Sequence, residues 1–405
     1  MQIEIPRQVA WILAQLKNRG FEAFAVGGCV RDTLLSKIPE DWDITTSAKP
    51  EQVKAIFGKT IDTGLQHGTV TVFREHVGYE ITTYRIDGEY EDRRHPKAVA
   101  FTANLEEDLR RRDFTINAMA YSHETGIVDI FGGMKDLQNG VIRCVGDATE
   151  RFTEDALRIL RAIRFSAQLG FSIEKSTYDA VSKIAPNLAF VSKERVQAEL
   201  TKILLSGHPE RIFLAEETGM SPYISQSFPF VFERTNGSVN LQLANQLKAD
   251  KALRYASFFC CISEAEAGQI LKELKMDNDT IGKVKTLVFW LPQPLTGERA
   301  ILRKVMSSMS DELFDDLLEL KRIIGPDAKE EVESAEKLCH SIREHGDCIR
   351  LKDLAVDGKD LMNMGIKPGP GLGEKLNELF ELVLKHPEYN DKDYLCTLVG
   401  KERQI

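Results

Sequence analysis

Residues 25–46 read AVGGCVRDTLLSKIPEDWDITT, and this stretch decides how the N-terminal part of the chain folds. An apolar run ends at Gly27 and Gly28, and the residues that follow, to Leu35, have helical character. Glycines let backbone amides approach a phosphate closely at the start of a helix, where the helix dipole also favours an anion. Arg31, one turn further, adds a guanidinium suited to phosphate. This turn therefore predicts half of a triphosphate-binding site.

Two carboxylates at the end of the same stretch predict the other half. Asp41 and Asp43 are two residues apart, so on a β-strand, expected over Trp42–Thr45, they project from the same face. In-line phosphoryl or nucleotidyl transfer uses two Mg²⁺ ions about 4 Å apart, held by such carboxylates. Glu80, in a second β-type run over Tyr79–Tyr84, is the candidate for a third catalytic carboxylate, which activates the attacking hydroxyl or completes the coordination.

Each of these features has a simpler explanation when it stands alone. A pair of glycines is often only a turn, and two acidic residues two apart often lie at a solvated strand end. Their order and spacing after a β-strand favour the functional interpretation. The sequence Gly58-Lys59-Thr60 is similar to the end of a P-loop, but the first glycine of that motif would fall at Val53, so we do not expect a P-loop.

The spacing of apolar residues predicts an α+β fold. In the first third of the chain, short β-type runs alternate with helices, and the runs at Thr69–Phe73 and Tyr79–Tyr84 are typical of a hairpin. Further on the period is helical, as in residues 154–170 and 192–207, each of which closes on a glycine. After residue 150 we expect helices and no strand.

Eight motifs follow one another in a specific order. They are GGCVRD (27–32), DWDI (41–44), HGTVTV (67–72), EITTYR (80–85), RRDFTINAMAY (111–121), DIFGG (129–133), EDALRILRAIRF (154–165) and KERVQAELTKIL (193–204). The first two resemble the nucleotidyltransferase superfamily, to which DNA polymerase β and poly(A) polymerase belong. The whole set resembles the class II tRNA nucleotidyltransferases, the bacterial CCA-adding enzymes.

The resemblance implies a division into domains. A polymerase-β-like nucleotidyltransferase head with a small β-sheet would be followed by all-helical neck, body and tail domains. The implied boundaries are 1–145 for the catalytic head, 146–206 for a neck that recognises the nucleobase, 207–326 for the body, and 327–405 for a tail that binds tRNA.

The resemblance also implies the activity and its residues. The activity is template-independent addition of C, C and A from CTP and ATP to the 3′ acceptor end of tRNA, with release of diphosphate and with Mg²⁺ as cofactor. The chain would act as a monomer or homodimer. The matching positions are Gly28 and Arg31 for the triphosphate, Asp41 and Asp43 for the metal, Arg112 for a nucleotide contact, and Asp155, Arg158, Arg161 and Arg164 for nucleotide binding by the neck.

The chemistry of the neck motif supports base selection. Residues three apart on a helix are neighbours, so Asp155 and Arg158 are expected side by side. A carboxylate accepts and a guanidinium donates, which suits the amino group and ring nitrogen of both cytosine and adenine. Uracil and guanine present the reverse pattern and would be rejected by roughly 1–3 kcal/mol per good pair. The alternative is a flank of arginines neutralised in surface ion pairs by Glu154 and Asp155.

Other segments allow a structural or a functional interpretation. In residues 111–121 we expect Phe114, Ile116, Ala118 and Met119 in the core, and Arg111, Arg112, Asp113 and Asn117 near the active face. Arg195 and Glu199, at i and i+4, are expected to be structural. The polar loop at 87–97 is similar to the loop that in the family accompanies the switch from C to A addition, and it fits an ordinary surface loop equally well.

Two features of the C-terminal half also allow both a structural and a functional interpretation. The Gly/Pro-rich turn in GIKPGPGLGEKL (365–376) would hold a phosphate through its backbone amides, or would simply join two tail helices. The basic residues of the body would line a tRNA track or be ordinary solvated side chains: Lys248, Lys251, Arg254, Lys272, Lys275, Lys283 and Lys285.

Composition and charge place limits on the class of protein. The chain has 405 residues, 42% of them apolar, and 53 basic against 62 acidic residues, for a net charge of −9. This composition excludes disordered and collagen-like chains. The acidic total argues against a nucleic-acid partner, but residues 151–204, with nine basic and six acidic residues, are net positive. Charge distribution, unlike total charge, is compatible with RNA binding.

No targeting or membrane-spanning pattern is present, so we expect a cytoplasmic protein that does not bind membranes. The seven cysteines form no CxxC pair and favour reduced thiols over disulfides or structural zinc. The rival functions are poly(A) polymerase, addition of only CC or only A, and an RNA-binding module without catalysis. GLQHGTVTV (64–72) argues against poly(A) polymerase, whose relatives typically carry a basic sequence there.

Overall fold

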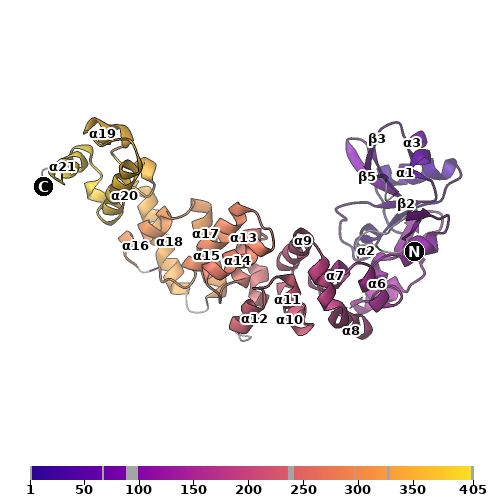
Figure 1. Cartoon of the computed structure of the whole chain (residues 1–405). Coiled ribbons are helices and arrows are strands. Elements are labelled where there is room, and N and C mark those ends of the chain that lie inside the picture. Colours follow the sequence, from indigo (N-terminus) through magenta and orange to yellow (C-terminus); the bar gives the residue numbers. More distant parts are fainter. Residues whose placement is uncertain are drawn as a thin grey trace. The chain divides into compact units, whose positions relative to one another are not determined.

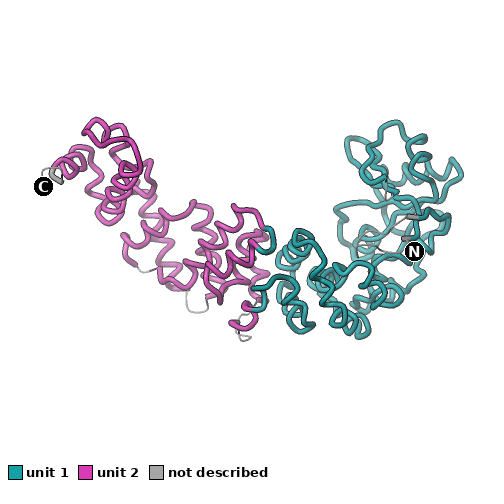
Figure 2. The backbone as a smooth tube through the Cα atoms, in the orientation of Figure 1, with its two compact units in different colours: residues 1–229, 273–275 teal, residues 230–272, 276–405 magenta. Residues whose placement is uncertain are grey.

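The computed structural model describes residues 2–65, 68–87, 99–235, 241–295, 297–325 and 329–402. The chain forms two compact units (Figure 2), residues 1–229 with 273–275, and residues 230–272 with 276–405. The first unit contains a β-sheet followed by helices, and the described part of the second is helical (Figure 1). The predicted α+β class is therefore confirmed. The finer division into head, neck, body and tail remains a prediction.

A mixed seven-stranded sheet, within the described ranges, forms the centre of the N-terminal part of the first unit, which we call the head. Its order is β3-β4-β5-β2-β1-β8-β9, and neighbours are antiparallel except for the parallel pair β2–β5. The strands are β1 (Ala23–Val26), β2 (Ile44–Thr46), β3 (Thr60–Gly64), β4 (Thr69–Arg74), β5 (Val77–Thr83), β8 (Met119–Ser122) and β9 (Gly126–Asp129). Two smaller ladders join β6 (Arg85–Asp87) to β7 (Val99–Phe101) and β10 (Val141–Ile142) to β11 (Ser172–Ile173).

The hairpin predicted from the sequence is the β4–β5 pair. Its two-residue turn consists of Glu75 and His76, whose φ values of 50° and 67° are both positive. Two positive φ values in succession characterise a type I′ turn, whose twist matches that of the flanking strands. The turn fixes the register that pairs Arg74 with Val77.

The head's core is built from apolar faces of predictable period. Helices α1 (Arg7–Asn18), α2 (Gly28–Leu34) and α3 (Pro50–Ile56) pack against the sheet. Helix α1 buries one stripe, at i, i+3, i+4 and i+7: Val9, Ile12, Leu13 and Leu16. The core residues predicted in the fifth motif are all fully buried, which confirms that prediction: Phe114, Ile116, Ala118 and Met119. Helices α4 (Leu105–Arg110) and α5 (Gly133–Asn139) complete the head.

The first unit continues into helices. They are α6 (Ala148–Glu154), α7 (Leu157–Leu169), α8 (Lys175–Ile184), α9 (Lys193–Leu204), α10 (Leu214–Glu217) and α11 (Ser221–Ile224). Helix α7 packs along α9 and ends at Gly170, whose φ of 72° lies in the left-handed region that glycine adopts without strain. The glycine stop expected at the end of residues 154–170 is therefore present.

Three local expectations were wrong. Asp41 and Asp43 do not lie on a strand but precede β2, because regular pairing with β1 begins at Ile44. The helix expected from Glu154 to Gly170 is broken at Asp155, whose extended backbone (φ −141°, ψ 102°) separates α6 from α7. A short strand, β11, does follow residue 150, because Ser172 and Ile173 pair in parallel with β10.

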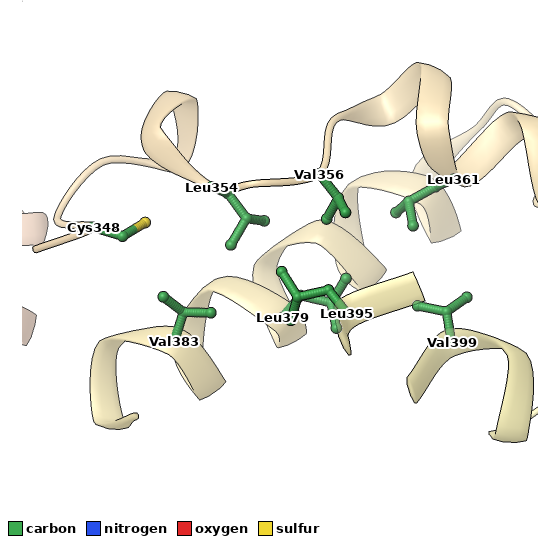
Figure 3. Packing of buried hydrophobic residues seen from close by; sticks show 8 residues of the cluster. All are labelled: Cys348, Leu354, Val356, Leu361, Leu379, Val383, Leu395 and Val399. Carbon is green, nitrogen blue, oxygen red and sulfur yellow. The ribbon is translucent and has the colours of Figure 1, made fainter. Parts of the chain in front are cut away.

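The second unit is a succession of helices. They are α12 (Pro229–Thr235, which begins at the end of the first unit), α13 (Lys251–Phe258), α14 (Glu264–Glu273), α15 (Asn278–Trp290), α16 (Arg299–Ser307), α17 (Asp311–Ile324), α18 (Lys329–Glu344), α19 (Gly358–Asn363), α20 (Pro370–Lys385) and α21 (Lys392–Glu402). Near the C-terminus, Leu379 and Val383 of α20 and Leu395 and Val399 of α21 form a core with Leu361 (Figure 3). No helix in the described ranges is long and apolar enough to span a membrane.

The structure shows the surroundings of several segments for which the sequence left two interpretations. The turn within 365–376 joins α19 to α20, as the plainer interpretation expected. Arg254 is 4% exposed and donates to the carbonyl oxygen of Leu247 at 2.8 Å, so it stabilises the fold rather than lining a surface track. Apart from Asp87, the predicted loop at 87–97 lies outside the described residues.

We predict that Gly133→Ala destabilises the first unit. A Cβ at this position would collide with the backbone of Thr115, whose carbonyl carbon would be 2.9 Å away. Because rigid backbone rather than a movable side chain opposes the methyl group, we expect a loss of about 2 kcal/mol in the free energy of unfolding, measured by urea denaturation. The matched variant Gly58→Ala, whose Cβ would meet nothing within 4 Å, should change it by less than about 0.5 kcal/mol. Equal effects of the two substitutions would contradict this close-contact explanation.

Candidate active site

A cavity of about 460 Å³ lies in the first unit, between the turn after β1, the segment before β2 and the C-terminal half of α7. It brings together five of the residues predicted from the sequence: Gly28, Arg31, Asp41, Asp43 and Arg164. The cavity lining does not include the other five: Glu80, Arg112, Asp155, Arg158 and Arg161. Lys37, Ile38 and Gln168 also line it, and no pattern in the sequence indicated them.

The turn after β1 is fixed by backbone geometry. Gly27 has a φ of 83°, and a Cβ there would lie 2.9 Å from Nη1 of Arg112, so the position requires glycine. The Val26 amide donates to the carbonyl oxygen of Asp43 at 3.0 Å. This bond holds the glycine turn and the acidic segment at the same edge of the sheet.

The acidic group consists of Asp41, Asp43 and Glu80. Ile44 pairs with Ile81 in the parallel β2–β5 ladder, so Asp43 and Glu80 precede paired residues at the same end. The pKa of Asp43 is raised, first because the surrounding protein removes water from its carboxylate and then because Asp41 repels its charge, while Arg112 opposes the rise. Partial burial, then Asp43 and Asp41, also raise the pKa of Glu80. The three charges therefore interact without full compensation.

These carboxylates fit magnesium in a particular way. The side chains of both aspartates line the cavity, and two negative charges that repel each other favour a bound cation. In the part of the chain that the structure describes, no three His, Cys, Asp or Glu side chains are grouped closely enough to hold a metal. Mg²⁺ commonly takes one or two protein carboxylates and completes its shell with water and substrate phosphates. The pair Asp41 and Asp43 suits that mode, and Glu80 does not complete a preformed three-carboxylate site.

Three guanidinium groups surround one aromatic ring. Arg31, Arg161 and Arg164 lie 5.2, 5.4 and 4.0 Å from the ring centre of Phe165, which is 4% exposed. Each of them has a carboxylate partner as well. Arg31 donates to Asp32 at 2.8 Å and to the Asn117 side-chain oxygen at 2.7 Å. The carboxylates offset much of the positive charge of the cluster, and Arg31 and Arg164 are the two of its arginines that line the cavity.

Arg161 and Arg164 connect α7 to other elements rather than pointing freely into the cavity. The Nε of Arg161 donates to Asp113 at 2.7 Å. Burial alone would raise the pKa of Asp113, but the charge and hydrogen bond of Arg161 override this effect and hold that pKa at about 2. Arg164 lies 2.7 Å from Glu199 on α9, and burial lowers the pKa of Arg164 to about 10. Buried ion pairs thus fasten α7 to the head and to α9.

Asp155 and Arg158 are not paired with each other as helical neighbours. Because α6 ends at Asp155, its carboxylate instead accepts the Leu157 amide at 3.1 Å and Nη2 of Arg195 at 2.8 Å. Arg158 donates to Glu154 at 2.7 Å. The expectation that helix geometry sets the pair side by side was therefore wrong, and the alternative of ion pairs describes this resting arrangement. Arg195, expected to be structural, binds Asp155.

Arg112 lies beside the glycine turn and next to Asp108, a residue that was not predicted from the sequence. Arg112 is 18% exposed and has an ion-pair distance of 3.6 Å to Asp108, which also binds Arg111 at 2.8 Å. Arg111 is thus paired with a buried acid. Asp108 precedes the two arginines by three and four residues, and that helical spacing is the signal that would have found it.

Comparisons with known proteins cover most of the chain. Family models match residues 23–143 (Poly A polymerase head domain), 170–229 (probable RNA and SrmB-binding site of polymerase A) and 248–399 (tRNA nucleotidyltransferase domain 2, putative). The CCA-adding enzyme of Leuconostoc mesenteroides is 38% identical over 391 residues, 95% of this chain and 93% of that protein. The CCA-adding enzyme of Limosilactobacillus reuteri is 36% identical, over 96% and 94% of the two chains. The Bacillus stearothermophilus CCA-adding enzyme, solved with CTP, has a TM-score of 0.81, with 31% identity over 99% of each chain.

We predict that Asp43→Asn stabilises the metal-free protein at neutral pH. The substitution removes a charge that is poorly solvated and repels Asp41 and Glu80, at the cost of its attraction to Arg112. It should raise the free energy of unfolding by about 0.5 kcal/mol, measured in urea with a chelator present. A raised pKa means that the folded state binds the proton more tightly than the unfolded state. Wild-type protein therefore recovers stability as pH falls through the raised pKa of Asp43, and the advantage of the variant should shrink.

The control for this experiment is Asp179→Asn, an exposed acidic residue on α8 that pairs with Lys175. It should give no gain at neutral pH. A variant advantage at Asp43 that does not change with pH would contradict charge repulsion as the cause.

Proposed function

The chain belongs to the family of bacterial CCA-adding enzymes, the class II tRNA nucleotidyltransferases, and on that premise we propose that it adds C, C and A to the 3′ end of tRNA from CTP and ATP. Addition would proceed one nucleotide at a time, without a nucleic-acid template, and release diphosphate. The reaction builds new 3′ ends and repairs damaged ones.

The observation that carries this proposal is the full-length likeness. The head alone matches a model named for poly(A) polymerase, so it cannot separate polyadenylation from CCA addition. Residues 248–399 match a tRNA nucleotidyltransferase domain, and the curated CCA-adding relatives are matched over at least nine-tenths of this chain. The likeness therefore favours CCA addition over poly(A) polymerase.

Within the cavity we assign binding and orientation to individual residues. Asp41 and Asp43 would hold Mg²⁺, and the amide of Gly28 with the guanidinium of Arg31 would orient the triphosphate. Bound Mg²⁺ would neutralise charge on the phosphates during in-line displacement by the terminal ribose hydroxyl. Glu80 would accept the hydroxyl proton, because its raised pKa brings its basicity closer to that task.

Base selection would require an exchange of partners at the start of α7. Asp155 and Arg158 now bind Arg195 and Glu154, respectively. A cytosine or adenine edge offers the complementary donor and acceptor to an Asp–Arg pair, whereas uracil and guanine do not. We therefore propose that the incoming base displaces Glu154 from Arg158 and adds to the ligands of Asp155. Arg161 and Arg164 would then act chiefly by holding α7 in place.

Three rival functions make different predictions. Poly(A) polymerase shares the head, an enzyme that adds only CC or only A shares the whole architecture, and an RNA-binding module would keep the fold without catalysis. The open carboxylates Asp41 and Asp43 argue against the last of these. Of the residues at 87–97, tied in the family to full CCA addition, only Asp87 is within the described ranges.

We predict stepwise addition of C, C and A when the purified protein is given tRNA that lacks its 3′ end, labelled CTP and ATP, and Mg²⁺. UTP and GTP should not be incorporated, and product length on sequencing gels should increase by three nucleotides. Asp41→Ala should abolish incorporation, because it removes a metal ligand, yet leave tRNA binding nearly unchanged in a filter assay. Long adenylate tails would favour polyadenylation, and arrest after two nucleotides would limit the activity to partial addition.

We also predict that Asp155→Ala relaxes base selection more than it weakens nucleotide binding. Loss of the carboxylate removes the acceptor that rejects uracil and guanine, so the preference for CTP over UTP should fall about tenfold, in line with one lost base-edge pair. The readout is the ratio of kcat/KM for the two nucleotides. Asp179→Ala on α8 provides an acidic control without effect on the ratio. An unchanged preference in Asp155→Ala would count against the template role of this residue.

A further inference from the structure

A fully buried acid, to which the mechanism above gives no role, lies next to the active site. Asp108, on α4, has no solvent exposure. Its Oδ1 accepts a hydrogen bond from Nε of Arg111 at 2.9 Å. Its Oδ2 accepts one from the hydroxyl of Thr45 at 3.0 Å and lies 3.6 Å from Nη2 of Arg112. One carboxylate thus joins two arginines and a strand residue.

The two arginines share this carboxylate unequally. Arg111 makes the short, well-directed contact and neutralises most of the negative charge of Asp108. Arg112, at the longer distance, keeps its positive charge available, and its Nε is buried without a hydrogen-bond partner among the described residues. One carboxylate cannot neutralise two guanidiniums, so a surplus of positive charge stays on Arg112, which also faces the negative charges of Asp43 and Asp113.

The surplus charge is directed at the site. Nη1 of Arg112 lies 2.9 Å from where a Cβ on Gly27 would be, so the guanidinium packs against the glycine turn. It is also close enough to Asp43 to oppose the rise of that residue's pKa. An anion bound at the glycine turn would therefore lie close to Arg112, although Arg112 is not part of the cavity lining.

Thr45 links the same carboxylate to the acidic segment. Thr45 is fully buried on β2, two residues after Asp43. Its hydroxyl bond to Asp108 therefore fixes the position of the strand that follows the metal-binding residues relative to Arg112. Asp108 connects the proposed cation ligands on one side with the proposed phosphate ligand on the other.

We propose that Asp108 is a positioning residue for nucleotide binding, which holds the Arg112 guanidinium against the glycine turn, where the phosphates of CTP or ATP bind. This inference rests on the proposed function. Two opposite effects decide its test. Removal of the negative charge alone would strengthen anion binding, whereas loss of orientation weakens it. Orientation dominates because Arg111 already offsets the negative charge of Asp108, whereas a misplaced Arg112 guanidinium loses directed, charge-assisted hydrogen bonds to phosphate.

The test is the isosteric variant Asp108→Asn, with the dissociation constants of CTP and ATP measured by calorimetry in Mg²⁺ without tRNA. We expect binding at least about tenfold weaker. The matched control is Asp136→Asn. Asp136 is also buried (5% exposed) and binds a threonine hydroxyl, Thr115 at 2.7 Å, and an arginine, Arg143 at 3.1 Å, but it does not contact Arg112. Its variant should lose stability but keep nucleotide affinity within twofold.

A double-mutant cycle separates positioning from general damage. In an Arg112→Ala background, Asp108→Asn should change the dissociation constant by less than twofold, because Asp108 would act through Arg112. An equal loss in both backgrounds, or unchanged or tighter binding in the single variant, would overturn the inference. Failure of the proposed function is distinguishable, since wild-type protein would then fail to bind at least one of the two nucleotides or fail to add C, C and A to tRNA.

Two substitutions at Thr45 test the same inference if Asp108→Asn does not fold. Thr45→Val removes the hydroxyl bond to Asp108 together with a longer one, at 3.3 Å, to the carbonyl oxygen of Thr82, and should weaken nucleotide binding a few-fold. Thr45→Ser, which retains the hydroxyl, should keep the affinity of the wild-type protein. Equal affinities of the valine and serine variants would also speak against a link through Thr45.

Discussion

The hydrogen bond from the Val26 amide to the carbonyl oxygen of Asp43 is the constraint on which the candidate site depends. It extends the pairing of β1 and β2 by one step and brings the glycine turn, which we propose binds phosphate, to the acidic segment. Strand β1 is also paired with β8 on its other side, so the turn emerges from the interior of the sheet. A mobile loop would lose affinity in ordering these groups, whereas this arrangement is already fixed by backbone bonds.

Buried ion pairs fix the helices around the sheet in the same way. Asp113 binds Arg161, Glu199 binds Arg164, and Asp108 binds Arg111. Such pairs add little net stability compared with apolar packing, but removal of one partner leaves an uncompensated buried charge and is strongly destabilising. They therefore favour one arrangement of α7 against the head over slightly shifted ones. This explains why several arginines with a nucleotide-binding signature serve here as structural anchors.

Much of the fold followed from local patterns, whereas the side-chain partners did not. The β4–β5 hairpin, the buried residues around Phe114 and the end of α7 at Gly170 depend on period, turn chemistry and glycine, which are local. Asp155 was misjudged because helical periodicity alone does not show that a residue terminates a helix to meet Arg195 on α9. Glu199 pairs with Arg164 on α7 rather than with its helical neighbour Arg195, and a partner on another helix cannot be read from spacing along one helix.

The sequence by itself determined the class of fold and the family resemblance, and it supplied the residues proposed to bind phosphate and metal, because all of these depend on residue type and short-range spacing. Only the tertiary structure decided which of them meet. Gly28, Arg31, Asp41, Asp43 and Arg164 line one cavity, while Asp155 and Arg158 are held by partners outside it. The tertiary environment also set the pKa values, since removal of water raises that of Asp43, whereas Arg161, distant in the chain, lowers that of Asp113 against the effect of burial.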